Sequence, residues 1–261
     1  MDQDHLFSQT EDKSHLKAMG LSEHLGELRV RLTRSVGAIV VFFIIAFSFA
    51  DDIMNYIKLP LMDALPEGNN ALHFTGPMDV LVANMKLSFL AAIVLSCPVW
   101  LYHFWRFLEP ALYQHEKKYI FPFILTSISL FTAGVCFCFF IMVPMTLDFL
   151  IGYGLEVGTA IITITDYVSL LMILIFGFGI VFETPLIIVL LALLDLVSAQ
   201  TLKDNRKIVL IGTLVLAALL TPPDPISQLA MAVPTYLMYE IALWIVVFLK
   251  RDNKQSPSHA A

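Results

Sequence analysis

Long apolar runs that are almost free of charge recur along this chain of 261 residues. A helix needs about 20 apolar residues to cross the hydrocarbon core of a bilayer. Hydrophobic residues make up 58% of the sequence and charged residues only 15%, against roughly 25% charged in a typical soluble domain. The runs therefore predict an all-α polytopic membrane protein, in which lipid solvates much of the apolar surface.

Six of these runs are candidates for membrane-spanning helices. They cover residues 35–50, 80–105, 119–144, 167–194, 208–220 and 226–249. The fifth run is short, because at about 1.5 Å per residue it covers only roughly 20 Å of a hydrocarbon core that is roughly 30 Å thick. We expect the bilayer to thin there. A proline-rich turn at residues 221–225 separates the fifth run from the sixth, and we expect the sixth helix to be shortened or kinked after it.

Basic residues are concentrated in alternate connections between the runs. Of the 16 lysines and arginines, only Lys58 and Lys86 lie in or beside the outside connections. Because cytoplasmic loops carry the excess of Lys and Arg, this pattern predicts six helices with both termini in the cytoplasm. The chain then divides into a cytoplasmic N-terminal segment (1–34), a membrane domain (35–249) and a disordered cytoplasmic tail (250–261).

Composition and motifs argue against several other functions. The net charge of −6 disfavours a nucleic-acid surface. All three cysteines lie in apolar runs without a histidine cluster, so we interpret them as small apolar side chains rather than metal ligands or disulfides. The sequence has no H-E-x-x-H and no G-x-x-x-x-G-K-[ST], so we predict no metal, no cofactor and no enzymatic activity.

A short amphipathic pattern precedes the first run. Four leucines recur there at spacings of four and three residues: Leu21, Leu25, Leu28 and Leu32. This spacing predicts a helix that lies along the cytoplasmic membrane surface and leads into the first span. Glu27 lies on its flank, where its simplest interpretation is an i,i+4 ion pair with Arg31, worth only about 0.3–0.5 kcal/mol.

The connection between the second and third runs is too apolar for a simple solvated loop. It reads FWRFLEPALYQHEKKYI over residues 104–120. Pro110 fixes a turn, and we expect Phe107, Leu112 and Tyr113 to pack against the bundle or the headgroup region. Glu116 then lies at the membrane interface, or is a solvated charge that balances the two lysines after it.

Two further polar features lie in the second half of the chain. Glu183 lies well inside the fourth run, where a carboxylate is costly and is by default a functional candidate. The alternative is a protonated side chain that is hydrogen-bonded to a neighbouring helix. Thr221, Asp224 and Gln228 surround the turn before the sixth run, where Asp224 suits the N-cap of the following helix.

Four motifs together resemble TatC, the multispanning receptor subunit of the twin-arginine protein translocase. They are HLGELRVR (24–31), FLEPALYQHEK (107–117), FETP (182–185) and TPPD (221–224). They occur in the family's order and on the expected sides of an N-in topology. The resemblance implies a concave six-helix bundle in the cell inner membrane that binds Arg-Arg signal peptides and exports folded proteins with the proton motive force.

The resemblance also implies a signal-peptide site. Its residues would be Glu27, Glu116, Phe107, Pro110, Leu112, Tyr113 and Arg29. A carboxylate can accept two donors from the planar guanidinium fork of an arginine, whereas a lysine offers a strongly hydrated point charge. Apolar neighbours would strengthen this discrimination by lowering the local dielectric constant.

Further roles follow from the same resemblance. Glu183 would be the intramembrane polar group of the concave face, where the bilayer thins. Thr221, Asp224 and Gln228 would dock single-span subunits of the TatA and TatB type, and a homo-oligomer within the receptor complex is expected. The outside segment from Phe74 to Asp79 fits the family pattern only loosely, so it receives no role.

Two other classes of function fit the sequence less well. A secondary transporter or proton-coupled channel that uses Glu183 would commonly contain inverted repeats and paired broken helices, and the chain has no detectable repeat. An intramembrane protease would need paired catalytic aspartates, a G-x-S-x-G elbow or a zinc motif. The sequence contains none of these.

Overall fold

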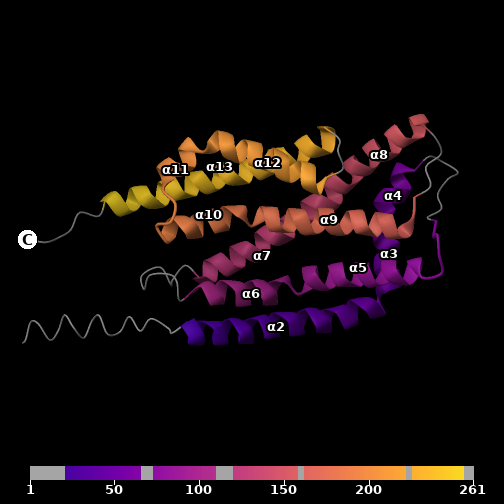
Figure 1. Cartoon of the computed structure of the whole chain (residues 1–261), viewed down its shortest axis with the longest axis horizontal. Coiled ribbons are helices and arrows are strands. Elements are labelled where there is room, and N and C mark those ends of the chain that lie inside the picture. The colour runs from indigo at the N-terminus through magenta and orange to yellow at the C-terminus, as the bar shows by residue number, and fades with distance from the viewer. Residues whose placement is uncertain (1–20, 66–72, 110–119, 158–161, 222–224, 256–261) are drawn as a thin grey trace, which may run out of the picture.

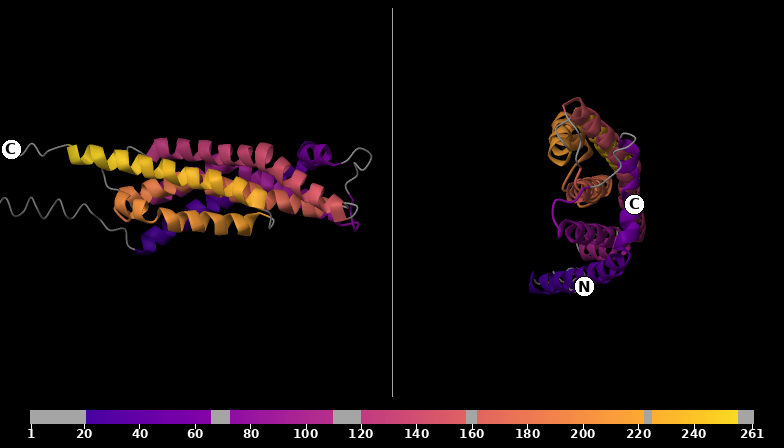
Figure 2. Two further views of the ribbon diagram at one scale, coloured as in Figure 1. Left: turned by 90° about the horizontal axis from the view of Figure 1, so that it is seen from above. Right: turned by 90° about the vertical axis from the view of Figure 1, so that its right-hand side faces the viewer.

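The computed structural model describes residues 21–65, 73–109, 120–157, 162–221 and 225–255. Within these ranges the chain is helical apart from short connections and an isolated bridge between His73 and Thr163. The helices run side by side in an elongated bundle (Figure 1). Seen end-on, they follow an open curve rather than a closed ring (Figure 2).

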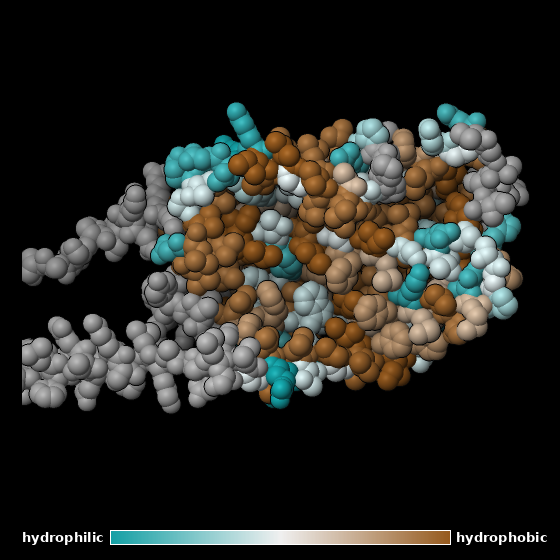
Figure 3. Space-filling view, in the orientation of Figure 1, coloured by the Kyte–Doolittle hydropathy of each residue, from teal (hydrophilic) through white to brown (hydrophobic). Residues whose placement is uncertain are grey.

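The lengths and composition of the helices confirm an all-α membrane protein. Among the described residues, four helical segments are long and apolar enough to cross a membrane, and a bent pair of helices would make a fifth. Apolar side chains cover much of the face shown in Figure 3. The exposed apolar residues of the described helices include Ile44, Ile211 and Trp244. Lipid is the solvent that such a surface requires. The count of six spans stays a prediction.

The first spanning helix, α2 (Leu21–Ser48), includes the amphipathic leucines and the first apolar run in one continuous helix. The separate surface helix that we expected is therefore not present. No proline interrupts this stretch, so its ladder of backbone hydrogen bonds continues from one segment into the other. Two short helices, α3 (Ala50–Ile57) and α4 (Leu59–Ala64), then occupy part of the predicted first outside connection.

The second run forms two helices, α5 (Asp79–Leu95) and α6 (Cys97–Leu108), which are bent by 55° relative to each other. Ser96 separates them, and Pro98 occupies the first turn of α6, where its missing N–H costs little. The indole Nε1 of Trp100 donates to the carbonyl of Ile93 at 3.1 Å and joins the two helices across the bend.

The third run continues further than the sequence predicted. It comprises α7 (Ile120–Phe137), a π-helical turn (Cys138–Met142) and α8 (Val143–Val157). We expected the helix to end at Pro144, and this was wrong. Pro144 instead lies in the first turn of α8, directly after the π-helical turn, where a helix tolerates proline. The second outside connection is correspondingly shorter than predicted.

The fourth run is broken at Glu183 into α9 (Ile164–Phe182) and α10 (Thr184–Leu193), and Pro185 lies in the first turn of α10. After α11 (Ala199–Asp204), the fifth run forms α12 (Arg206–Leu220), which has 15 residues and ends where predicted. The last helix, α13 (Pro225–Gln255), has 31 residues and contains Pro234. The expectation of a shortened sixth helix is therefore wrong.

The core of the bundle centres on α9. Tyr167, Leu171 and Phe178 of this helix are fully buried and belong to one apolar cluster with Met142 and Met231. This packing fixes α9 against the π-helical turn and α13. The break at Glu183 therefore lies at a rigid position in the interior of the molecule.

Candidate functional site

Glu27 lies near the start of α2 and already has a partner. The Nε of Arg31 donates to Oε1 of Glu27 at 2.8 Å, and Nη2 of Arg31 contacts the same oxygen. The side chains of Glu27 and Arg31 are only 22% and 18% exposed. The ordinary i,i+4 ion pair that the sequence suggested is thus present in the structure.

The second carboxylate oxygen of Glu27, Oε2, differs from Oε1 in its hydrogen bonding. Oε2 is buried and has no hydrogen-bond partner among the described residues. A buried carboxylate oxygen without a donor is energetically costly. Glu27 therefore retains acceptor capacity that Arg31 does not use. The nearby Arg29, another predicted member of the site, is exposed.

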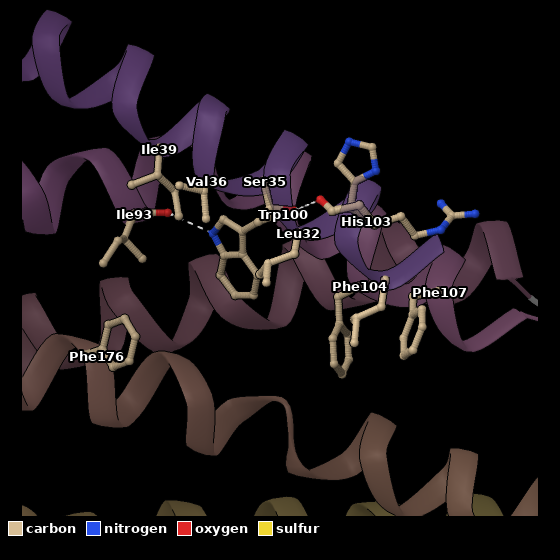
Figure 4. Close-up of a pocket in the computed structure, with 12 residues that line it drawn as sticks. Leu32, Ser35, Val36, Ile39, Ile93, Trp100, His103, Phe104, Phe107 and Phe176 are labelled. Atoms are coloured by element: carbon tan, nitrogen blue, oxygen red, sulfur yellow. Dashed lines mark hydrogen bonds between the residues drawn. The ribbon is translucent and has the colours of Figure 1, made fainter. Parts of the chain in front are cut away.

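An apolar pocket of about 330 Å³ lies between α2 and α6 beside this ion pair (Figure 4). Its walls include Leu28, Arg31 and Leu32 from α2 and Trp100, Phe104 and Phe107 from α6. The three aromatic residues are spaced by four and three positions, which places them on one face of α6. This spacing was a signal for the pocket that our reading of the sequence missed.

The structure tests only part of the predicted signal-peptide site. It brings Phe107 to the same pocket as Arg31 and thus close to the helix that carries Glu27. The remaining predicted members lie outside the described residues: Pro110, Leu112, Tyr113 and Glu116. The joint action of Glu27 and Glu116 therefore stays a prediction.

Glu183 is buried at the break between α9 and α10, with 8% of the residue exposed. Its Oε2 accepts a hydrogen bond of 2.7 Å from the hydroxyl of Ser127 on α7, and Oε1 has no partner among the described residues. A hydrogen bond to a neighbouring helix, which belonged to the alternative interpretation of Glu183, is thus present, and a functional role of this residue stays a prediction. Ser127 could not be identified beforehand, because it is 56 positions away in the sequence.

Two glycines allow α7 and α9 to approach closely enough for this hydrogen bond. A Cβ atom at Gly134 would lie 2.8 Å from the carbonyl oxygen of Phe178 and 2.9 Å from the side chain of Phe182. A Cβ atom at Gly179 would lie 2.6 Å from the ring of Phe131. These distances are well below ordinary van der Waals contact, so both positions require glycine.

The polar residues near the turn between α12 and α13 bond mainly within the chain. The Thr221 hydroxyl is buried and donates to the Ala217 carbonyl at 2.8 Å. Gln228 donates from Nε2 to the Leu214 carbonyl at 3.1 Å and so joins α13 to α12. Asp224 lies outside the described residues. A docking role for these residues stays a prediction.

A polar cluster that sequence analysis did not predict joins α11, α12 and α13. Arg206 donates from Nη2 to Glu240 at 2.8 Å, and the Tyr236 hydroxyl donates to the other oxygen of Glu240 at 2.9 Å. The Tyr239 hydroxyl donates to the Leu202 carbonyl at 2.5 Å. Glu240 therefore faces protein rather than lipid headgroups.

At the opposite end of the bundle, short polar contacts order the segments that the sequence predicts to lie outside. Asp79 accepts hydrogen bonds from the hydroxyl and backbone N–H of Thr75 and from the backbone N–H of Gly76. His73 pairs with the chain around Thr163 through backbone hydrogen bonds of 3.0 and 3.1 Å.

Comparison with known proteins decides the family. The family model described as "Sec-independent protein translocase protein (TatC)" matches residues 23–234, which is most of the chain. The chain belongs to the TatC family. It is therefore a membrane component of the Tat protein-transport system, as the four motifs predicted.

Individual TatC proteins are similar to this chain over most of their length. TatC of Escherichia coli (strain K12) is 37% identical over 231 residues, which cover 87% of this chain and 88% of that protein. TatC of Desulforapulum autotrophicum is 37% identical over 222 residues, covering 85% and 82%. A crystal structure described as the twin-arginine translocase receptor TatC has a TM-score of 0.75 and 35% identity, and the match covers 87% of this chain and 99% of that one.

Proposed function

We propose that this TatC protein is the signal-peptide receptor and core subunit of a twin-arginine translocase. It binds Arg-Arg signal peptides at its cytoplasmic face and exports folded proteins with the proton motive force. The single observation that carries this proposal is Glu27, whose largely buried carboxylate keeps one oxygen without a partner among the described residues. A similar crystal structure is itself described as a twin-arginine translocase receptor.

The chemistry of the site favours arginine over lysine. A guanidinium can donate two parallel hydrogen bonds to the two oxygens of a carboxylate, and it loses less hydration than an ammonium when it is buried. The pocket lined by Phe104 and Phe107 lies beside Glu27 and keeps water away from such a pair. Glu116, on the adjoining cytoplasmic segment, supplies the second carboxylate for the second arginine.

The proposal includes a topology of six spans with both termini in the cytoplasm of a cell with an inner membrane. The arrangement of the basic segments supports it. The start of α2, the end of α6, α11 and the end of α13 all lie at one end of the bundle (Figure 1). Together with the start of α12, which directly follows α11, these segments carry ten of the twelve lysines and arginines among the described residues, so one end of the bundle matches the positive-inside rule.

Two further roles belong to this proposal. Glu183 is the intramembrane polar group over which the bilayer thins, since the short α12 has only 15 residues. Thr221, Asp224 and Gln228 dock TatA- and TatB-type single-span subunits, and several copies of this chain join in one receptor complex. Because Thr221 and Gln228 already donate to carbonyls of α12, they would offer a partner their remaining acceptor capacity.

The affinity of the purified protein for an Arg-Arg signal peptide tests the receptor proposal. Glu27→Gln keeps the size of the side chain but removes the charge, so we expect affinity to fall about tenfold or more. Asp204→Asn is the matched control: it removes one negative charge from the segment predicted to be cytoplasmic, and Asp204 bonds only to Gln200 among the described residues. Unchanged affinity in Glu27→Gln, or an equal loss in both variants, would contradict the proposal.

A further inference from the structure

The Glu27 carboxylate is already occupied by a guanidinium of the same chain. Arg31 directs two of its donors, Nε and Nη2, at a single oxygen, Oε1. The other oxygen, Oε2, is shielded from solvent and has no partner among the described residues. An incoming guanidinium that binds both oxygens must therefore displace Arg31 from Oε1 and must move the Glu27 side chain so that Oε2 becomes accessible.

We propose that Arg31 is an intramolecular competitor that sets the affinity threshold of the signal-peptide site. This inference rests on the proposed receptor function. In the closed state, Arg31 takes the place of the peptide's arginine at Glu27. In the open state, Glu27 is available and binds the peptide. The apparent affinity for any peptide that needs the open state is then reduced by the fraction of molecules in that state.

The surroundings of Arg31 suit a side chain that moves between two positions. Arg31 lines the apolar pocket together with Leu28 and Leu32, in the N-terminal half of α2. A long basic side chain can keep its stem against apolar surface while its charged head moves to water. Opening therefore costs the ion pair with Glu27 but leaves the packing of the stem in place.

The threshold has a consequence for selection of peptides. A peptide that offers only one favourable contact cannot offset the loss of the internal ion pair and stays unbound at ordinary concentrations. A peptide with two arginines and an apolar segment makes enough contacts to hold the open state. Competition of this kind weakens all peptides by the same factor, so it decides which of them bind detectably without changing their order.

The test measures affinities of Arg-Arg and Lys-Lys signal peptides for the full-length protein in detergent. Arg31→Gln removes the competitor, so both peptides should bind about two- to fivefold more tightly, and by the same factor. Arg31→Lys keeps the charge but has a single ammonium in place of the two donors, so it should give an intermediate gain. In a Glu27→Gln background, Arg31→Gln should leave the peptide affinity unchanged, because the carboxylate for which Arg31 and the peptide compete is absent.

Arg34→Gln is the matched control for charge. Arg34 lies one turn further along α2, is exposed and forms no salt bridge with any described residue. If Arg34→Gln tightens peptide binding as much as Arg31→Gln does, charge repulsion between the protein and the peptide explains the gain. The proposed role of Arg31 as a competitor is then refuted. Weaker or unchanged binding in Arg31→Gln also refutes it. Failure of the receptor proposal is a separate result, since Glu27→Gln alone would then bind the Arg-Arg peptide normally.

Discussion

The carboxyl group of Glu183 lies among apolar side chains with one hydrogen bond, from the hydroxyl of Ser127, for support. A polar group in this environment depends on each donor that it has, because water is not available to replace it. The bond also crosses from α7 to the break between α9 and α10, so it links the polar site to the packing of the bundle.

Ser127→Ala tests how much this hydrogen bond contributes. The substitution leaves both oxygens of Glu183 without a donor among the described residues, so we expect a loss of about 1–3 kcal/mol in the free energy of unfolding. Ser129→Ala is the control, since Ser129 is exposed and, among the described residues, bonds only to the Leu125 carbonyl of its own helix. Thermal unfolding in detergent measures both variants, and equal midpoints would show that the bond to Glu183 contributes nothing.

Single residues were only partly predictable from the sequence. The pattern of apolar runs identified Glu183 as a buried acid, and the spacing of Glu27 and Arg31 identified their ion pair. Their other surroundings depend on contacts between distant segments, such as the 56 positions that separate Ser127 from Glu183. Local spacing carries no information about such pairs, which is why Ser127 and the Arg206–Glu240 pair were missed.

At the scale of helices, the contact between α7 and α9 depends on close approach at Gly134 and Gly179. Glycine normally weakens a helix because its backbone loses the most entropy on folding. Here that cost is offset by packing, because neighbouring backbone and ring atoms fill the space that a Cβ atom would take. Small residues at such positions are typical of helix contacts in membranes, where backbones approach closely.

Gly134→Ala should disrupt this contact. The added methyl group would meet the backbone oxygen of Phe178, which cannot turn away as a side chain can, so α7 and α9 must separate. We expect a loss of about 1–3 kcal/mol in the free energy of unfolding, measured by thermal unfolding in detergent. Gly37→Ala on α2 is the control, since nothing lies within 4 Å of its added methyl group. A loss as large in the control would contradict close packing as the cause.

Boundaries of helices were harder to predict than their existence. The apolar runs predicted the end of α12 at Leu220 correctly. The third helical run, however, continues past Pro144 through α8, and α13 continues to Gln255. Proline in the first turn of a helix is compatible with continued helix, so Pro144 was a misleading stop signal. The two short helices α3 and α4 lie in a segment that we read as a loop, because each is too short to show a clear period.

At the scale of the whole molecule, the helices form a curved layer rather than a closed bundle (Figure 2). The predicted cytoplasmic segments gather at one end of this layer, and the short helices α3 and α4 lie toward the other (Figure 1). An open curve offers a surface for a bound segment and does not enclose a pore. This shape agrees with a receptor better than with a channel that uses Glu183.

The central claim is that Glu27 and Glu116 together recognise paired arginines at the cytoplasmic face. Photocrosslinking in native membranes tests it most directly, with a signal peptide that carries a photoreactive residue beside Arg-Arg or beside Lys-Lys. We expect strong crosslinking to this chain for the Arg-Arg peptide, weak crosslinking for the Lys-Lys peptide, and a loss of the Arg-Arg product in Glu27→Ala and Glu116→Ala. Equal crosslinking of both peptides that neither substitution reduces would contradict the account.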